Sequence, residues 1–233
     1  MALATARTSR DRSLSPETSR DAGVEVERQL VVAGCRTVAG VDEVGRGAWA
    51  GPLTVCVAVV AGDDLEGFPA GVRDSKLLSP RQRERLFAPV AEHLCCHGIG
   101  HASAEECDRL GMGAAQRLAA SRALEVLDVS PDGIIVDGPR DFTGRSGALS
   151  IVGADRRCAV VAAASILAKV TRDRLMIAAA ETNPGYGFER NKGYASVEHR
   201  LAVARLGTTP IHRLTWSVSP VVSVGGAGLL AAS

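Results

Sequence analysis

The chain has 233 residues, of which 46% are hydrophobic, 23% charged and 3% aromatic, and its formal net charge is +1. This length allows one sizeable hydrophobic core, and the scarcity of aromatic side chains argues against a protein that binds single strands by base stacking. No apolar run reaches the ~18 residues of a membrane span, so we expect no membrane association. The six cysteines follow no metal-ligand spacing, and we expect reduced thiols and a cytoplasmic location.

Charge is unevenly distributed along the chain. Residues 156–213 carry ten Lys and Arg against four Asp and Glu, whereas the remainder is acidic. An acidic part joined to a basic part suits a metal-carboxylate centre beside a surface that binds a polyanion. Chance clustering on solvated helices would give the same pattern, so charge alone does not decide the function.

The first part of the chain changes from polar to apolar. Residues 1–28 are rich in Ser, Thr, Arg and Asp without an apolar period, and we expect a flexible tail. From Leu30 an apolar run leads into a first strand that ends at Asp42 and Glu43. The continuous apolar run at residues 53–61 predicts a second strand, buried on both faces.

Two helices and a third strand are expected next. Residues 79–82 (SPRQ) form a capping-box pattern for a helix that runs to about residue 93. Residues 94–102 predict the third strand, and the short links among the three strands favour an antiparallel meander. A second capping box at residues 103–106 predicts one long helix that extends to about residue 127.

The second half of the chain alternates strands with helices. Short strands are predicted at residues 133–138 and 148–152, and a helix, apolar and then basic, at residues 160–180. A turn-rich stretch precedes a final helix at residues 196–206, which Gly207 stops. Residues 218–233 form a small, apolar C-terminal tail.

The first strand ends in two adjacent carboxylates and a Gly-Arg-Gly turn. Adjacent strand side chains point to opposite faces, so Asp42 and Glu43 can share one ion only where the strand ends and the backbone bends. Gly45 and Gly47 permit that bend, and their N–H groups lie beside Arg46 in a loop that can bind a phosphate or a sugar. A polar strand end followed by an ordinary tight turn would have the same sequence.

Two further strands lead to carboxylates, Asp137 and Asp155. If these strand ends adjoin, four carboxylates meet at one edge of a sheet, and like charges repel unless a cation neutralises them. Hard divalent ions such as Mg²⁺ and Mn²⁺ take oxygen ligands. A pair of them about 4 Å apart would position a water for phosphodiester cleavage.

Five segments together resemble the bacterial ribonuclease HII family, in the family's order and at family-like intervals. They are residues 40–47 (GVDEVGRG), 74–76 (DSK), 136–138 (VDG), 162–173 (AAASILAKVTRD) and 186–194 (YGFERNKGY). The first and fourth are highly specific. The resemblance implies an α/β, ribonuclease-H-like fold: a mixed β-sheet flanked by helices in a domain over residues 29–217, with a helical C-terminal part at about 181–217.

The resemblance also implies an activity. Such an enzyme cleaves the RNA strand of RNA–DNA hybrids and nicks 5′ of single ribonucleotides embedded in duplex DNA, leaving 3′-hydroxyl and 5′-phosphate ends. It would thereby remove misincorporated ribonucleotides and RNA primers during repair and replication. The implied cofactor is Mn²⁺ or Mg²⁺, held by the catalytic residues Asp42, Glu43, Asp137 and Asp155, and we expect a monomer.

Recognition of the ribonucleotide is implied for two elements. The Gly45–Gly47 loop corresponds to the family element that detects the 2′-hydroxyl through backbone groups. Tyr194 corresponds to the tyrosine whose ring packs on the ribonucleotide sugar. This agrees with the general role of the 2′-hydroxyl in distinguishing RNA from DNA.

Four further side chains are candidates for phosphate contacts. Ser165 and Lys169 lie four residues apart on one helix face, which Arg172 extends, so they can present a hydroxyl and two cations to a backbone phosphate. Lys76 is a similar candidate. A solvated helix end and a plain turn lysine are the ordinary alternatives.

The chain departs from the family pattern in two places. Gly153 stands where many members have a lysine, so Arg156 or Arg157 would have to supply that cation. Residues 212–213 (HR) begin like the family's His-Arg-Arg-Ser-Phe ending, but residues 214–216 (LTW) do not continue it, and we assign no catalytic role there.

Three alternatives remain open at this point. A ribonuclease HIII normally carries an extra N-terminal substrate-binding domain, for which residues 1–28 are too short. A DNA junction resolvase of the same fold would not need the Gly-Arg-Gly loop and Tyr194. A catalytically inactive hybrid-binding protein would not need four intact acids.

Overall fold

The computed structural model describes residues 21–215. The expected tails at residues 1–28 and 218–233 therefore fall wholly or mostly outside the described residues. Helix α1 (Glu25–Val32) lies partly within the first of them, so the expected lack of structure up to residue 28 is wrong at its end, and the apolar run from Leu30 continues this helix before the first strand. Val26 and Leu30 of α1 pack against the buried core, a contact that the local sequence pattern does not reveal.

A five-stranded mixed sheet forms the centre of the molecule. Its strands are β1 (Thr37–Val44), β2 (Leu53–Ala61), β3 (Cys96–Ala102), β4 (Gly133–Asp137) and β5 (Leu149–Ile151), and their spatial order is β3-β2-β1-β4-β5. The pairs β1–β2 and β2–β3 are antiparallel, whereas β1–β4 and β4–β5 are parallel. The expected mixed sheet and the antiparallel meander are both confirmed.

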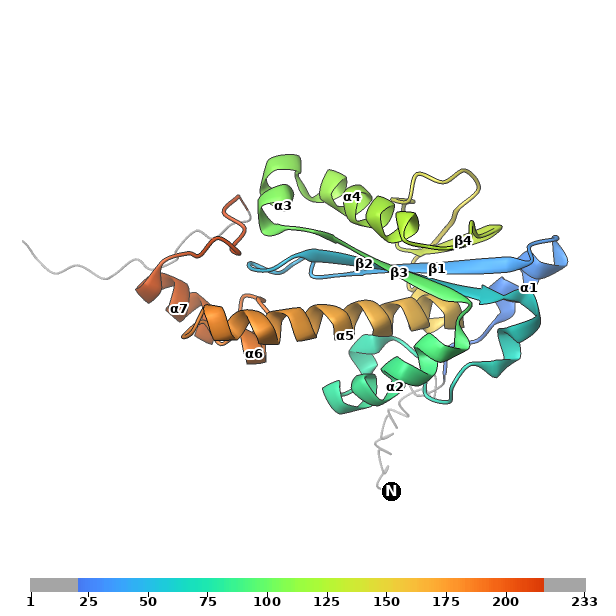
Figure 1. Cartoon of the computed structure of the whole chain (residues 1–233), viewed down its shortest axis with the longest axis horizontal. Coiled ribbons are helices and arrows are strands. Elements are labelled where there is room, and N and C mark those ends of the chain that lie inside the picture. Colours follow the sequence, from blue (N-terminus) through green and yellow to red (C-terminus); the bar gives the residue numbers. More distant parts are fainter. Residues whose placement is uncertain (1–20, 216–233) are drawn as a thin grey trace, which may run out of the picture.

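Helices cover both faces of this sheet (Figure 1). The helices after β2 are α2 (Pro80–His93), α3 (Ala104–Leu110), α4 (Met112–Glu125), α5 (Ala159–Thr182), α6 (Phe188–Asn191) and α7 (Val197–Leu206), of which the first four cover the sheet. Helices α3 and α4 lie over one face, and α5 lies along the other with α2 beside it. Both side chains of the capping box at Ser79 and Gln82 make their hydrogen bonds, as expected for the start of α2.

The single long helix expected after residue 103 is instead two helices. Gly111 has φ +74°, a left-handed conformation that ends α3 and begins α4. Glycine adopts this conformation without a steric cost, so the chain can turn here although both sides have helical periodicity.

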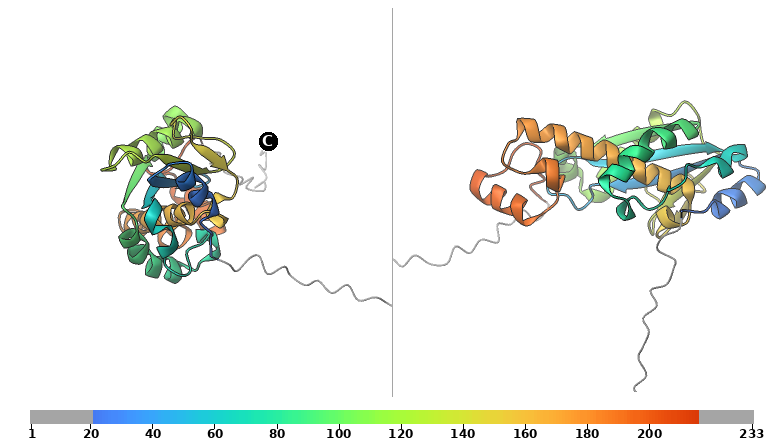
Figure 2. Two further views of the ribbon diagram at one scale, coloured as in Figure 1. Left: turned by 90° about the vertical axis from the view of Figure 1, so that its right-hand side faces the viewer. Right: turned by 90° about the horizontal axis from the view of Figure 1, so that it is seen from below.

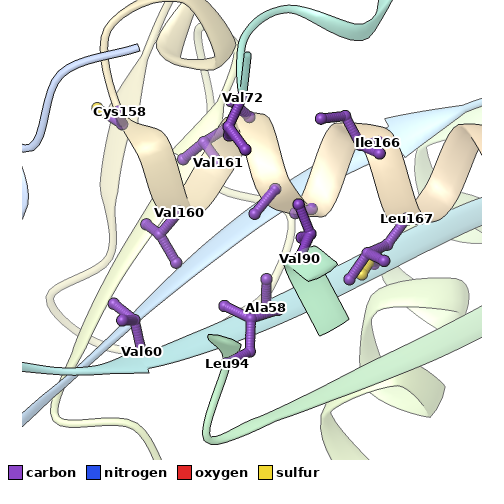
Figure 3. Close-up of a cluster of buried hydrophobic side chains, with 14 of the residues drawn as sticks. Ala58, Val60, Val72, Val90, Leu94, Cys158, Val160, Val161, Ile166 and Leu167 are labelled. Carbon is purple, nitrogen blue, oxygen red and sulfur yellow. The ribbon is translucent and has the colours of Figure 1, made fainter. Parts of the chain in front are cut away.

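Helix α5 is the central helix of the fold. Val160 and Leu167 on this helix point towards the side on which Ala58 and Val60 of β2 lie, and Ile166 belongs to the same buried cluster (Figure 3). The first half of α5 is buried on all sides, which explains its apolar sequence without a polar face.

Helices α6 and α7 form a smaller helical part at one end of the molecule (Figure 2). Tyr186 and Phe188 stack with ring centroids 5.4 Å apart and pack against Met176 near the end of α5. The loop between β1 and β2 reaches this part, since Ala50 pairs with His212 in an isolated β-bridge. Within residues 21–215, no helix is long and apolar enough to cross a membrane.

Candidate active site

The parallel pairing of β1 and β4 brings two carboxylates together. Val41 pairs with Val136, so the residues that follow, Asp42 and Asp137, lie next to one another at the ends of the two strands. Both also follow the alternation that directs their side chains towards α5. Asp137 accepts a hydrogen bond from the backbone N–H of Ala154 (2.8 Å), which links the end of β4 to the turn that carries Asp155.

Asp42 is an unusually basic carboxyl. Its residue is only 4% exposed, and burial, followed by the neighbouring charges of Glu43 and Asp137, raises its pKa to about 8. Burial also raises the pKa of Glu43, and the charge of Asp137 adds to this effect against the opposing charge of Arg46. The Ser165 hydroxyl donates to Asp42, and Ser75 in turn lies 2.8 Å from the Ser165 oxygen.

A second acidic pair lies beside the first. Burial, followed by the charge of Asp74, raises the pKa of Asp155 to about 6, and the two carboxyl groups are hydrogen-bonded to each other. Lys76 lies 3.4 Å from Asp155, and the acidic neighbours raise the pKa of its ammonium although partial burial opposes this. Arg156 donates to Asp74 (3.2 Å) rather than to any of the four predicted metal ligands.

The donor set fits hard divalent cations. Among the described residues, no group of three or more His, Cys, Asp or Glu side chains is arranged closely enough to coordinate a metal ion. Repulsion between carboxylates nevertheless adds to the effect of burial, because the charges of Glu43 and Asp137 help to raise the pKa of Asp42 and the charge of Asp137 acts in the same direction on Asp155. Bound cations would relieve that repulsion, and carboxylate oxygens are the ligands that Mg²⁺ and Mn²⁺ prefer.

The Gly-Arg-Gly loop follows directly from β1. Gly45 is buried with φ +87°, and a Cβ atom there would lie 2.2 Å from Nε of Arg172. Gly47 is exposed, with no heavy atom within 4 Å of the position that a Cβ would take. The Arg46 side chain is also exposed and lies 3.8 Å from Glu43. The first glycine therefore shapes the loop, whereas the second leaves its outer surface open.

Tyr194 is held close to this loop. The carbonyl oxygen of Gly193 accepts hydrogen bonds from the backbone N–H groups of Trp49 (2.8 Å) and Ala50 (3.1 Å). The guanidinium of Arg172 lies 5.3 Å from the centre of the Tyr194 ring, and the Lys169 ammonium lies 5.7 Å from it. The residue before Tyr194 is thus bonded to the backbone that follows the Gly-Arg-Gly loop in the β1–β2 connection.

The structure contradicts the expected phosphate contact of Arg172. This residue is fully buried, and its guanidinium donates to three carbonyl oxygens, those of Ala50, Pro52 and Lys192. Ser165 is also buried and faces Asp42 rather than an open surface. In both cases the helix periodicity correctly predicts a shared face, but that face packs against other elements instead of solvent.

Lys169 lines a groove of about 490 Å³ between α2 and residues 190–194, the segment that includes Tyr194. Its ammonium donates to Asp173 (2.6 Å). The groove is lined by more basic than acidic side chains, and its basic residues are Arg81, Arg83, Lys169, Arg190 and Lys192.

A sequence model of the family Ribonuclease HII matches residues 39–219. The chain belongs to the ribonuclease HII family. A Ribonuclease HII from Streptomyces avermitilis is 47% identical over 194 residues, which cover 82% of each chain. A Ribonuclease HII from Thermus thermophilus is 48% identical over 176 residues, which cover 76% of this chain and 84% of the relative.

Solved structures of related enzymes share the fold. The ribonuclease H2 from Pyrococcus horikoshii OT3 superposes with a TM-score of 0.67 and 32% identity, over 78% of this chain and 94% of that one. The Bst-RNase HIII structure in complex with Mn²⁺ has a TM-score of 0.65 at 19% identity, over 92% of this chain and 74% of that one, and supports the fold alone. Membership of the ribonuclease HII family identifies a divalent-metal-dependent ribonuclease H that acts on RNA–DNA hybrids.

Several buried polar residues around the ribonuclease HII site have no predicted role from the sequence. Asp74 is 1% exposed and interacts with Asp155, while Arg213 is fully buried and donates to the carbonyl oxygens of Arg46 and Gly51. The family-like HR pair at residues 212–213 was the only local signal for Arg213. Its partners lie more than 160 residues earlier in the chain.

Proposed function

We propose that this enzyme nicks duplex DNA on the 5′ side of a single embedded ribonucleotide, as well as cleaving the RNA strand of longer hybrids. The products carry 3′-hydroxyl and 5′-phosphate ends. In the cell this activity removes misincorporated ribonucleotides and RNA primers. The six cysteines are all free thiols, which agrees with action in the reducing cytoplasm.

One observation carries this proposal: the β1–β2 connection that begins with the Gly-Arg-Gly loop is tied to the segment that carries Tyr194, beside the carboxylates. The Gly193 carbonyl accepts from the backbone N–H groups of Trp49 and Ala50, and Arg172 bridges the carbonyls of Ala50 and Pro52 to that of Lys192. A rigid unit of this kind can test one sugar for its 2′-hydroxyl, with loop backbone groups on one side and the Tyr194 ring on the other. It needs only one ribonucleotide to act.

The catalytic work is assigned to the four acids, with Asp42, Glu43, Asp137 and Asp155 holding Mg²⁺ or Mn²⁺. A pair of such cations supplies the Lewis acidity that activates water and stabilises the leaving 3′-oxygen in phosphodiester hydrolysis. Ser165 orients the Asp42 carboxylate by donating to it.

Cationic side chains hold the nucleic acid in place. Lys76 is 72% exposed at its side chain and adjoins Asp155, so it can contact the phosphate next to the cleaved bond. It therefore also supplies a cation near the position where Gly153 replaces the lysine of many relatives. Lys169 and the exposed Arg81 of the groove beside Tyr194 contact phosphates further along the strand.

The decisive experiment uses an end-labelled DNA duplex with one internal ribonucleotide, a matching all-DNA duplex and a long RNA–DNA hybrid. Each is incubated with Mn²⁺, Mg²⁺ or EDTA. We expect a metal-dependent nick 5′ of the single ribonucleotide and no cleavage of the all-DNA duplex. Asp42→Asn should abolish cleavage while hybrid binding persists.

A second pair of variants separates recognition from chemistry. Tyr194→Ala removes the ring and should lower kcat/KM at the single ribonucleotide by about 10–100-fold, whereas Tyr194→Phe keeps the ring and most of the activity. Cleavage of long hybrid without nicking at a single ribonucleotide would favour a ribonuclease HIII-like preference. Hybrid binding without any cleavage would identify an inactive binding protein, and wild-type rates in Asp42→Asn would refute the metal-ligand assignment.

A further inference from the structure

Two histidines meet in the interior of the C-terminal part. His199 lies in the first turn of α7 and His212 lies in the segment that follows it, and their Nε2 atoms are 3.1 Å apart. His199 is fully buried and His212 is 2% exposed. Tyr186 and Phe188 enclose the pair with their rings.

The surrounding hydrogen bonds determine where each ring carries its proton. The backbone N–H of Thr209 donates to Nδ1 of His212 (2.9 Å), so the proton of His212 is on Nε2. That N–H must then donate to Nε2 of His199, which leaves the proton of His199 on Nδ1. From there it donates to the backbone carbonyl oxygen of Tyr194 (2.9 Å).

The other end of this chain of hydrogen bonds is attached to residues 49–51, which follow the Gly-Arg-Gly loop. The Gly51 N–H donates to the carbonyl of Ile211, and the Arg213 N–H donates to the carbonyl of Trp49. His212 lies between these two bonds and pairs with Ala50. The histidine pair therefore connects the Tyr194 carbonyl to the strand-like segment that supports the loop.

The pair is neutral at the pH of a cleavage assay. Burial, followed by the charge of His199, lowers the pKa of His212 to about 4, and burial also lowers the pKa of His199. Each ring thus has one donor and one acceptor, and both are engaged. Only one orientation of the two rings satisfies all of these hydrogen bonds, and that orientation fixes the position of the Tyr194 backbone.

We propose that His199 is a positioning residue for ribonucleotide recognition: its ring proton, which His212 holds on Nδ1, fixes the Tyr194 carbonyl in place. This inference rests on the proposed function, because it assigns the pair to recognition of the embedded ribonucleotide. It predicts that the hydrogen bond from His199 to Tyr194, rather than the ring volume, is the feature that matters.

Two substitutions at His199 separate the two hydrogen bonds of its ring. In His199→Asn the amide nitrogen can occupy the place of Nδ1 and still donate to Tyr194, but the contact with His212 is lost. In His199→Gln the amide oxygen can reach the place of Nε2 and accept from His212, but Tyr194 loses its donor. Each variant thus removes one buried hydrogen bond of similar energy.

KM and kcat are measured for the single-ribonucleotide duplex, with thermal unfolding of each variant. We expect His199→Gln to raise KM by about tenfold, the value of one hydrogen bond, while His199→Asn stays within about twofold of the wild type and both variants lose similar stability. Equal KM values in the two variants, or a larger increase in His199→Asn, would overturn the inference.

A measurement on the wild-type protein covers the case in which the variants do not fold. Nitrogen-15 NMR of the histidine rings should find the proton on Nε2 of His212 and on Nδ1 of His199, and any other tautomer overturns the inference. A wild-type enzyme that does not nick at a single ribonucleotide would overturn the proposed function as well. If it nicks and the tautomers or KM values disagree, only the inference fails.

Discussion

Gly45→Ala tests whether the first glycine of the loop is required by the backbone and by Arg172. The substitution adds one methyl group at a buried position with φ +87°, and that methyl would lie 2.2 Å from Nε of Arg172. Arg172 cannot move away freely, because its guanidinium is held by the carbonyls of Ala50, Pro52 and Lys192. Either the backbone or this hydrogen-bond network must change.

The expected cost has two parts. An alanine in a left-handed conformation costs about 1–2 kcal/mol. Displacing Arg172 from the Pro52 carbonyl leaves a buried charged donor poorly satisfied, at about 1–3 kcal/mol. A total near 3 kcal/mol corresponds to a decrease in Tm of roughly 6–12 °C for a protein of this size.

Gly47→Ala is the matched control within the same loop. A Cβ at Gly47 meets no heavy atom within 4 Å, and its φ lies outside the left-handed region. We expect its free energy of unfolding to stay within about 0.5 kcal/mol of the wild type. Urea and thermal unfolding of the three proteins measure the difference, and equal stability of the two variants would refute the reasoning.

Three further predictions concern stability. Glu27 of α1 accepts a hydrogen bond from the Val160 N–H at the start of α5 (3.0 Å). Glu27→Ala should therefore lower the free energy of unfolding in urea by about 2 kcal/mol, and Glu27→Gln, which keeps an acceptor, should lower it clearly less. Equal losses of stability in the two variants would show that side-chain volume matters instead. Folding lowers the pKa of His212 from its ordinary value of 6.5 to about 4. The free energy of unfolding should therefore decrease by about 1–3 kcal/mol as the pH falls from 6.5 to 4. Unfolding measured at pH 7.5 and 5.0 should show a weaker pH dependence in His212→Gln. Mn²⁺ at about 100 times its Kd should stabilise the wild-type protein by about 2.7 kcal/mol. EDTA should reverse this stabilisation and stop cleavage. If Mn²⁺ stabilises Asp137→Asn as much as the wild type, Asp137 is not a metal ligand.

Much of the fold was predictable because it depends on residues that are neighbours in the chain. The capping box at Ser79 and the apolar run at residues 53–61 act over a few residues, and the structure confirms the helix and strand that they predict. The helix predicted at residues 160–180 appears as α5, with bounds two residues or less away. Where a tertiary contact was needed, as for α1, the local pattern was insufficient.

The predicted site shows the same division. Carboxylates at strand ends could be identified one by one, and the resemblance to a family indicated which belong together. The packing of α5 against the sheet then determines that Arg172 is buried and that Ser165 faces Asp42, since a helix face has no fixed exposure until it meets a neighbour.

Local sequence thus specified the strands, the helix starts and the presence of adjacent acids before a Gly-Arg-Gly turn. Contacts between distant segments specified the raised pKa of Asp42 and the attachment of the Tyr194 segment to the backbone after the Gly-Arg-Gly loop. Arg172 reaches a carbonyl 120 residues earlier, and His212 meets His199 through rings whose proton positions depend on both neighbours. Burial and hydrogen-bond partners are properties of the packed chain, because each requires two segments that only folding brings together.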